Sequence, residues 1–496
     1  MERKVGFDNA AYIKKQSEQI EKRIKDFGGK LYLEFGGKLF DDYHASRVLP
    51  GFAPDSKLQM LQNIGQDVEI VIVISAGDIE NNKIRGDLGI TYGNDVLRLT
   101  DAFREIGLYV GSVVISQFSG QPAATAFKNK LEHLGMKVFM HYPIEGYPTN
   151  IKNIVSEQGY GKNEYIETTR PLVVVTAPGP GSGKMATCLS QLYHEYNRGV
   201  SAGYAKFETF PIWNLPLKHP VNLAYEAATA DLQDVNMIDP YHLEAYGITT
   251  VNYNRDVEVF PVLNAIFERI EGKSPYKSPT DMGVNMAGYC IIDDDVIKKA
   301  SRDEIVRRYY TTLCDRRGGR CTQAVVEKLE LVMRQAGVST DDRVVVKYAI
   351  DRSAETENQP AVAIELPDGR IVTGKTSALL GSSAAALLNA VKVLGEIDKN
   401  THLIDPAVIE PIQKLKTKIL NSRNPRLHSD EVLIALSISA AGNKTALKAF
   451  NNLLSLRGCE AHSTVILVQS DQDTYRKLGI NLTSEPKYQT TNFYHQ

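Results

Sequence analysis

Three glycines and a lysine stand close together in the stretch PGPGSGKM (178–185). They follow the apolar run LVVV (172–175), which predicts a buried strand. A strand, a glycine-rich turn and a helix together suit phosphate binding, because backbone N–H groups converge on the anion and the helix N-terminus adds positive potential. We therefore expect a nucleotide or phosphate site here, with phosphate-binding residues Gly179, Gly181, Ser182, Gly183, Lys184 and Thr187.

This stretch departs from the Walker A pattern G-x-x-x-x-G-K-[ST] at two positions. Pro178 stands at the first glycine, and Met185 replaces the hydroxyl residue that normally holds Mg²⁺. Thr187 lies two positions further along and is a poor geometric substitute for that hydroxyl. The alternative is a plain strand-to-helix turn in which Lys184 is a solvated first-turn residue. The alternating glycines favour the phosphate site over this alternative.

A second stretch, GRIVTGKT (369–376), matches the Walker A pattern completely. Its surroundings indicate a different structure, because the turn residues Pro367, Asp368 and Gly369 separate the runs 361–366 and 370–374. The β-branched residues within this stretch are also too stiff to wrap closely around a phosphate. We expect a β-hairpin here, with Lys375 outside any phosphate site.

Two acidic residues are candidates for chemistry beside Lys184. Asp78 follows the apolar run VEIVIVIS (68–75), and ligands of open parallel sheets bind beyond the carboxyl ends of the strands. Asp281 lies in a polar, glycine-punctuated stretch (278–290), and internal loops of this kind often carry function. We expect Lys184 to stabilise transferring charge and Asp78 or Asp281 to position Mg²⁺ or a nucleophile, so these three are the candidate catalytic residues.

The stretch 35–44 holds a second glycine pair followed by Lys38. Because Gly36 and Gly37 follow an expected strand, this turn is a further anion-facing candidate, and we add Lys38 to the phosphate-binding residues. The alternative for the residues that follow is a surface helix with a capping aspartate and an ion pair.

The cysteines and histidines do not follow a metal-binding pattern. The five cysteines, at positions 188, 290, 314, 321 and 459, have neither disulfide-framework nor zinc-ligand spacing. His194 and Glu195 are not followed by the second histidine of H-E-x-x-H. We expect no zinc-protease site, and the use of any other metal is left open.

Apolar runs alternate with helical stretches over the first part of the chain, with strands expected at 30–35, 68–75, 110–118, 137–142 and 205–210. This alternation indicates an α/β fold with tandem or interleaved parallel-sheet, Rossmann-like units, followed by a C-terminal α+β domain. We expect further strands at 342–351 and 464–469. The expected domains are an N-terminal α/β domain (1–168), a second α/β domain with the phosphate loop and a helical extension (169–338), and the C-terminal domain (339–496).

Charge and composition exclude several kinds of partner. The 496 residues carry a formal net charge of −2, which gives no reason to expect nucleic acid or an anionic membrane surface. The N-terminal residues lack the apolar core of a signal peptide, and no run approaches the roughly 20 apolar residues that cross a bilayer. We expect a cytoplasmic protein whose partner is a phosphorylated small molecule.

An apolar helix with a small-residue surface is expected at 377–397. A helix that is apolar over so much of its circumference must be covered on most sides. We expect a homo-oligomer that uses this surface, and the alternative is that helices within 406–456 cover it in the same chain.

The blocks FGGKLFDDYHASRVLPGF (35–52), VTAPGPGSGKMAT (175–187) and SPTDMGVNMAGYC (278–290) resemble a bacterial family of uncharacterised proteins with a domain of unknown function. The resemblance runs over the whole chain, and some members carry the label "ATP-dependent zinc protease". It implies a bacterial cytosolic protein, and it supplies no reaction and no catalytic residues.

From the residues, the expected function is phosphoryl transfer or ATP hydrolysis. The cofactor is left open, with ATP and Mg²⁺ as the candidates. One alternative is a transferase that binds a phosphorylated metabolite without hydrolysing a nucleotide. Another is a non-catalytic scaffold that senses a ligand.

Overall fold

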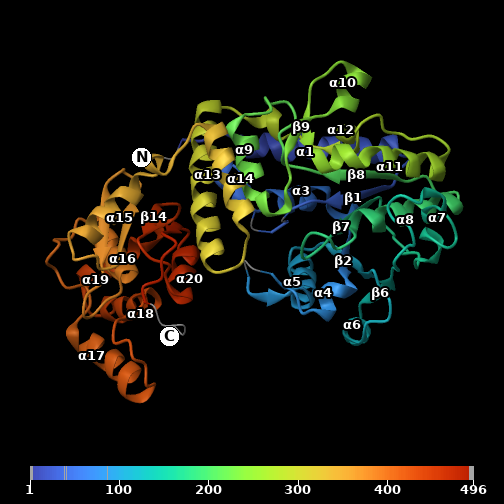
Figure 1. Cartoon of the computed structure of the whole chain (residues 1–496). Coiled ribbons are helices and arrows are strands. Elements are labelled where there is room, and N and C mark those ends of the chain that lie inside the picture. Colours follow the sequence, from blue (N-terminus) through green and yellow to red (C-terminus); the bar gives the residue numbers. More distant parts are fainter. Residues whose placement is uncertain (1–3, 38, 41, 86–87, 491–496) are drawn as a thin grey trace. The chain divides into compact units, whose positions relative to one another are not determined.

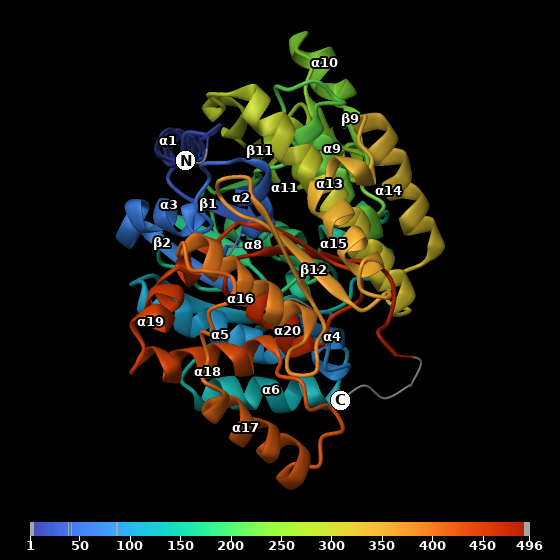
Figure 2. The same cartoon turned by 90° about the vertical axis from the view of Figure 1, so that its left-hand side faces the viewer.

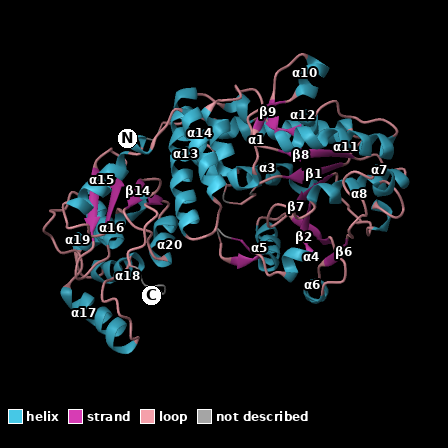
Figure 3. Cartoon of the chain, viewed as in Figure 1, coloured by secondary structure: helices cyan, strands magenta, loops and turns pink. Residues whose placement is uncertain are grey.

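A computed structural model describes residues 4–37, 39–40, 42–85 and 88–490. The chain divides into two compact units, one formed mainly by residues 4–226 and 233–301 and the other mainly by residues 302–490 (Figures 1 and 3). We call them the sheet unit and the C-terminal unit. No helix among the described residues is both long enough and apolar enough to cross a membrane.

A seven-stranded sheet forms the core of the sheet unit, and every neighbouring pair in it is parallel. The strand order is β11-β8-β1-β7-β2-β5-β6. Its strands are β1 (Leu31–Phe35), β2 (Val68–Ser75), β5 (Tyr109–Ser116), β6 (Lys137–Met140), β7 (Leu172–Thr176), β8 (Gly203–Phe207) and β11 (Gly283–Val284).

Strands from both sides of residue 168 alternate in this one sheet, because β7 lies between β1 and β2. The α/β class is confirmed, and of the two arrangements considered the interleaved one describes the molecule. The boundary expected between residues 168 and 169 falls inside the sheet, where it separates β7 from both of its neighbours.

Helices cover both faces of the sheet. The connection from β7 to β8 runs in the opposite direction to the connection from β2 to β5, so right-handed crossovers place α8 and α5 on opposite faces. The helices of this unit are α1 (Asn9–Asp26), α2 (Tyr43–Val48), α3 (Ser56–Ile64), α4 (Ala76–Glu80), α5 (Tyr92–Glu105), α6 (Pro122–His133), α7 (Ile151–Ile154), α8 (Lys184–Asn197), α9 (Pro220–Ala228), α10 (Pro240–Tyr246), α11 (Asn254–Glu271) and α12 (Pro279–Met282). Two short antiparallel pairs join β3 (Ile84–Arg85) to β4 (Ile90–Thr91) and β9 (Asn236–Ile238) to β10 (Val251–Tyr253).

A mixed four-stranded sheet in the order β13-β12-β14-β15 forms the centre of the C-terminal unit. Its strands are β12 (Ala361–Glu365), β13 (Ile371–Lys375), β14 (Glu460–Ser463) and β15 (Asn481–Ser484). The antiparallel pair β12–β13 confirms the β-hairpin predicted for the complete Walker A match. The helices are α13 (Asp294–Arg317, which begins in the sheet unit), α14 (Gln323–Ala336), α15 (Val344–Ala354), α16 (Ser382–Leu394), α17 (Pro406–Lys414), α18 (Ser429–Ala440), α19 (Lys444–Asn451) and α20 (Gln469–Lys477).

Two expected strands of this unit are wrong. Residues 344–354 form helix α15, which follows a capped turn at Ser339 and buries Val345, Val346 and Ala349 along one face against β12. The helical spacing of these buried residues outweighed the strand preference of the β-branched run. The strand expected at 464–469 instead lies at β14, just before it.

Helix α16 is the small-residue helix expected at 377–397. It contacts β12, β13, α18 and α19 of the same chain, which cover its buried residues. Figure 2 shows α18 and α19 beside α16. The alternative of cover within one chain therefore describes this helix. That the protein is a homo-oligomer stays a prediction, and the small-residue surface of α16 no longer supports it.

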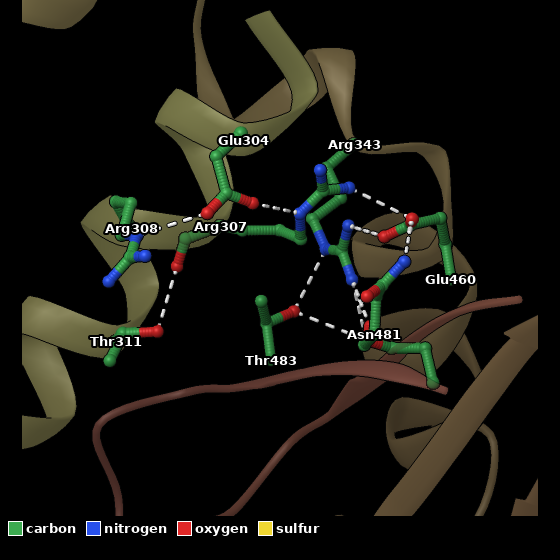
Figure 4. A network of polar contacts seen from close by, with 9 residues as sticks. Glu304, Arg307, Arg308, Thr311, Arg343, Glu460, Asn481 and Thr483 are labelled. Carbon is green, nitrogen blue, oxygen red and sulfur yellow. Dashed lines mark hydrogen bonds and ion pairs between the residues drawn. The ribbon is translucent and has the colours of Figure 1, made fainter. Parts of the chain in front are cut away.

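A buried polar network ties α13 to the sheet of the C-terminal unit (Figure 4). Arg307 and Arg343 both donate to the carboxylate of Glu460, with the bond from Arg307 at 2.8 Å. Burial alone would raise the pKa of Glu460, but the two guanidinium groups lower it to about 2. Each arginine also donates a further hydrogen bond, Arg307 to the carboxylate of Glu304 and Arg343 to the hydroxyl of Thr483.

Candidate functional site

The carboxyl ends of all seven strands meet at one edge of the parallel sheet, which we call the carboxyl edge. The chain leaves β1 toward the β6 end of the sheet, where it forms β2 on the far side of β7. It leaves the neighbouring strand β7 toward the β11 end, where it forms β8 on the far side of β1. Ligands of open α/β sheets bind at such reversal points. The glycine-rich stretch after β7 lies at this point of the edge.

The loop 177–183 joins β7 directly to α8. Gly181 and Gly183 have φ angles of +75° and +90°, which glycine adopts without the strain that a side chain would add. Gly183 is the N-cap of α8 and offers no side chain to cap it. In the described part of the chain, no group accepts a hydrogen bond from the first-turn amides at 184–186. This loop therefore leaves a row of N–H donors bare at a helix N-terminus.

Two buried hydroxyl groups on this loop and helix also lack partners. Ser182 is 2% exposed and Thr187 is 1% exposed, and neither hydroxyl has a hydrogen-bond partner among the described residues. Burying a hydroxyl without a partner costs about 1–3 kcal/mol, so two at one loop need an explanation. Ser116 anchors the loop to the end of β5 by donating to the carbonyl of Ser182 at 2.6 Å.

Lys184, the first residue of α8, is half-buried. Within the described ranges its ammonium group neither donates a hydrogen bond nor forms an ion pair with any side chain. Ser182, Lys184 and Thr187 therefore lie with the loop glycines around donors that have no acceptor among the described residues. Their role in phosphate binding stays a prediction.

Asp78 lies near this loop but is engaged elsewhere. It belongs to α4, directly after β2, and its carboxylate pairs with Lys83 at 3.1 Å. The Lys83 ammonium lies 5.0 Å from the centre of the Tyr92 ring, and the Tyr92 hydroxyl lies against Gly179, where a Cβ would come within 2.2 Å of it. Asp78 also lines an open depression between α4, α5 and α6.

The structure does not bring Asp281 to the loop. Asp281 precedes β11, which lies three strand positions from β7, or roughly 14 Å at the usual strand spacing. Its carboxylate accepts hydrogen bonds from the Tyr246 hydroxyl at 2.8 Å and from the Lys277 amide at 3.0 Å. These contacts give Asp281 a local structural role.

Lys38, the remaining predicted phosphate-binding residue, lies outside the described residues. The residues after it follow the helix alternative, because Asp42 caps α2 through the Ala45 amide and forms an ion pair with Lys57 at 2.7 Å. Asp42 and Lys57 are both buried.

Sequence analysis missed two charged residues inside strands at the carboxyl edge. Glu34 of β1 lies in register with Val175 of β7 on one side and Lys206 of β8 on the other. Glu34 accepts a hydrogen bond from the Tyr204 hydroxyl at 2.7 Å. The sequence offered one signal for them. Each lies among apolar residues of an expected strand, Glu34 in KLYLEF (30–35) and Lys206 in AKFETF (205–210).

Lys206 is the centre of an ionic cluster on this edge. Its ammonium group contacts Asp256, in the first turn of α11, and Glu208, at 3.0 Å. The Trp213 indole N–H donates to the second oxygen of Glu208 at 3.1 Å. Burial raises the pKa of Glu208. The positive charge of Lys206 lowers this pKa, the negative charge of Asp256 raises it further, and together these effects give a pKa of about 7. Glu208 can therefore change charge near neutral pH.

No three His, Cys, Asp or Glu side chains in the described ranges are grouped as a metal site requires. The absence of tightly bound zinc stays a prediction, which metal analysis of the purified protein would test.

Comparisons with known proteins give a family for the whole chain. The family model "Domain of unknown function DUF1846, N-terminal" matches residues 5–337, and "Domain of unknown function DUF1846, C-terminal" matches residues 341–494.

Two similar proteins are "UPF0371 protein str1377" of Streptococcus thermophilus, 58% identical over 492 residues, and "UPF0371 protein SpyM50764" of Streptococcus pyogenes, 58% identical over 490 residues. Each alignment covers 99% of both chains. A solved structure, "Structure of the Aeropyrum Pernix ORC2 protein (ADPNP-ADP complexes)", covers 90% of this chain and 88% of its own at 8% identity and a TM-score of 0.16. A likeness that low carries no argument about fold or function. The family matches and these relatives together show that the chain belongs to the bacterial DUF1846 family.

Proposed function

We propose that the chain binds the phosphate group of a small molecule at the loop 179–187. The observation that carries this proposal is that bare amides, an unpaired lysine and two unsatisfied buried hydroxyls meet at one loop among the described residues. A phosphate oxygen is a strong acceptor, and it would satisfy several of these donors at once.

The reaction that this arrangement supports best is phosphoryl transfer. Phosphoryl transfer needs positioning and charge stabilisation more than covalent help, and the loop amides with Lys184 supply both. Glu34, on the strand next to β7, pairs in register with Val175 near the end of β7, and its carboxylate would position Mg²⁺ or a nucleophile. Asp78 keeps this role as the alternative, in helix α4 directly after β2, the other strand that neighbours β7.

One observation favours a second candidate, a transferase that binds a phosphorylated metabolite without hydrolysing a nucleotide. Met185 occupies the position where a hydroxyl residue normally holds the Mg²⁺ of a bound nucleotide triphosphate. Magnesium-dependent release of phosphate from ATP would favour phosphoryl transfer. Phosphate-ester binding that is indifferent to Mg²⁺, with no turnover of ATP, would favour the second candidate.

Replacing Lys184 by alanine should weaken the binding of pyrophosphate by about 1.5–3 kcal/mol, the range for a hydrogen bond that involves a charged group. Isothermal titration of the wild type and of the Lys184→Ala variant measures this difference.

The chain offers a matched control in Lys375, which holds the same place in the complete Walker A match but is exposed on strand β13. Lys375→Ala should leave pyrophosphate binding unchanged. Equal affinities of the wild type and Lys184→Ala, or a loss with Lys375→Ala instead, would remove Lys184 from the site.

A further inference from the structure

The ionic cluster around Lys206 lies on the same edge and the same face of the sheet as the phosphate loop. We propose that Glu208 and Asp256, held by Lys206, form a subsite for hydroxyl groups, so that the ligand is a phosphate ester with a hydroxylated ring. This inference rests on the proposed phosphate site and names the class of molecule that it takes.

The register of the sheet fixes the position of this subsite. Val175, Glu34 and Lys206 form one row across β7, β1 and β8, so Lys206 lies two strand spacings, or roughly 10 Å, from the strand that carries the loop. Parallel partners in register point to the same face, and residues two apart along a strand share a face. Glu208 follows Lys206 by two residues, just beyond the end of β8, so in an extended chain its side chain lies on the same face as that of Lys206.

Helices α8 and α11 both pack on this face. The cluster of buried apolar residues here includes Val175 of β7 and Tyr204 of β8 together with residues of both helices. Lys184 begins α8, and Asp256 lies in the first turn of α11. Both helices therefore start at the carboxyl edge, one beside the phosphate loop and the other beside the ionic cluster.

The cluster holds more acidic groups than a structural ion pair needs. Three carboxylates, those of Glu34, Glu208 and Asp256, lie around the single ammonium group of Lys206. A Lys206–Asp256 pair alone would be neutral, so Glu208 is in excess for a structural ion pair. Each oxygen of Glu208 already accepts from one partner, Lys206 or Trp213, and a carboxylate oxygen has a second lone pair that a ligand hydroxyl can use.

Trp213 gives the subsite an aromatic side. The indole is half-buried and donates to Glu208. It packs against Gly283, where any side chain would collide with the ring because a Cβ would come within 2.5 Å of it. A flat apolar surface beside carboxylate acceptors suits a sugar ring, which presents C–H groups on its faces and hydroxyls at its rim. The side chains of Lys206 and Asp256 are 17% and 14% exposed and that of Glu208 is 5% exposed, so Lys206 and Asp256 are the part of the cluster that reaches solvent.

Trp213 also provides the readout, because it is the single tryptophan of the sequence. The probes are inorganic phosphate, ribose 5-phosphate and AMP, titrated into the full chain by calorimetry and by tryptophan emission. We expect at least one of the two esters to bind about tenfold or more tighter than inorganic phosphate and to change the emission, as a few added hydrogen bonds would do. The ester that binds more tightly tells whether a free sugar phosphate or a nucleotide is the better source of the ring.

The variants are Glu208→Gln and Asp256→Asn, with Glu258→Gln as the control on an exposed carboxylate of the same helix. Either subsite variant should remove the advantage of the ester, leave inorganic phosphate within about twofold and retain the wild-type circular dichroism. Esters that bind no tighter than inorganic phosphate, or an advantage that survives in either variant, would overturn the subsite while leaving the phosphate site in place. Failure of all three probes to bind would overturn the phosphate site itself.

Discussion

Replacing Glu460 by alanine should lower the free energy of unfolding of the C-terminal unit by about 3 kcal/mol, the low end of the cost of breaking a buried ion pair. The variant would leave the guanidinium groups of Arg307 and Arg343 without their shared carboxylate, and these residues are only 8% and 6% exposed. Asn481, which donates to Glu460 at 2.8 Å, would lose its acceptor as well. Urea unfolding followed by far-UV circular dichroism measures the change.

The control for this prediction is Glu410→Ala, which removes one partner of the exposed pair between Glu410 and Lys414. Surface pairs contribute little, so this variant should be indistinguishable from the wild type. If Glu460→Ala is equally mild, the network in Figure 4 does not hold α13 against the sheet.

The second large effect is on the pH dependence of stability, through Glu208. Its pKa is about 7 in the folded protein against an ordinary value of 4.5, so between these values the folded state holds a proton that the unfolded state has released. Stability therefore falls as the pH rises through this window, and above pH 7 the ionised Glu208 destabilises the fold. Glu208→Gln cannot ionise, and it should be more stable than the wild type above this window by on the order of 2 kcal/mol.

Urea unfolding followed by Trp213 emission measures this difference, because Trp213 lies in the sheet unit and its indole contacts Glu208. The difference between the variant and the wild type should grow from pH 5 to pH 8, across the window set by the two pKa values. A difference that stays constant over this range would show that Glu208 keeps one charge throughout. Glu258→Gln, the exposed control, should show no such trend.

Sequence patterns predicted those parts of the fold that depend on neighbours in the chain. The run 68–75 became β2 with the same bounds, and the turn at 367–369 joins β12 to β13. These predictions hold because an uninterrupted apolar run and a Pro-Asp-Gly turn each have few alternative structures. Helix α15 was missed, because its valines favour a strand locally while their burial against β12 follows a helical period.

The candidate site was predictable only where it is continuous in sequence. Residues 179–187 form a strand-to-helix loop because the glycines, the lysine and the helix that follows are adjacent in the chain. The sequence could not show that Glu34 and Lys206 lie near this loop. Their position depends on the strand order, in which β7 lies between β1 and β2 and β8 lies next to β1. Asp281 was chosen for its loop, and the position of β11 at the other end of the sheet order removes it from the site.

The most direct test of the phosphate site is to locate an anion in crystals of the protein. Tungstate has the shape and charge of a phosphate-like oxyanion, and its anomalous scattering marks its position without reference to the surrounding map. We expect one strong peak within hydrogen-bond distance of the amides at 183–186 and of Lys184 Nζ, absent from crystals of Lys184→Ala. A peak at 374–376 instead, or no peak at the loop after β7, would contradict the account.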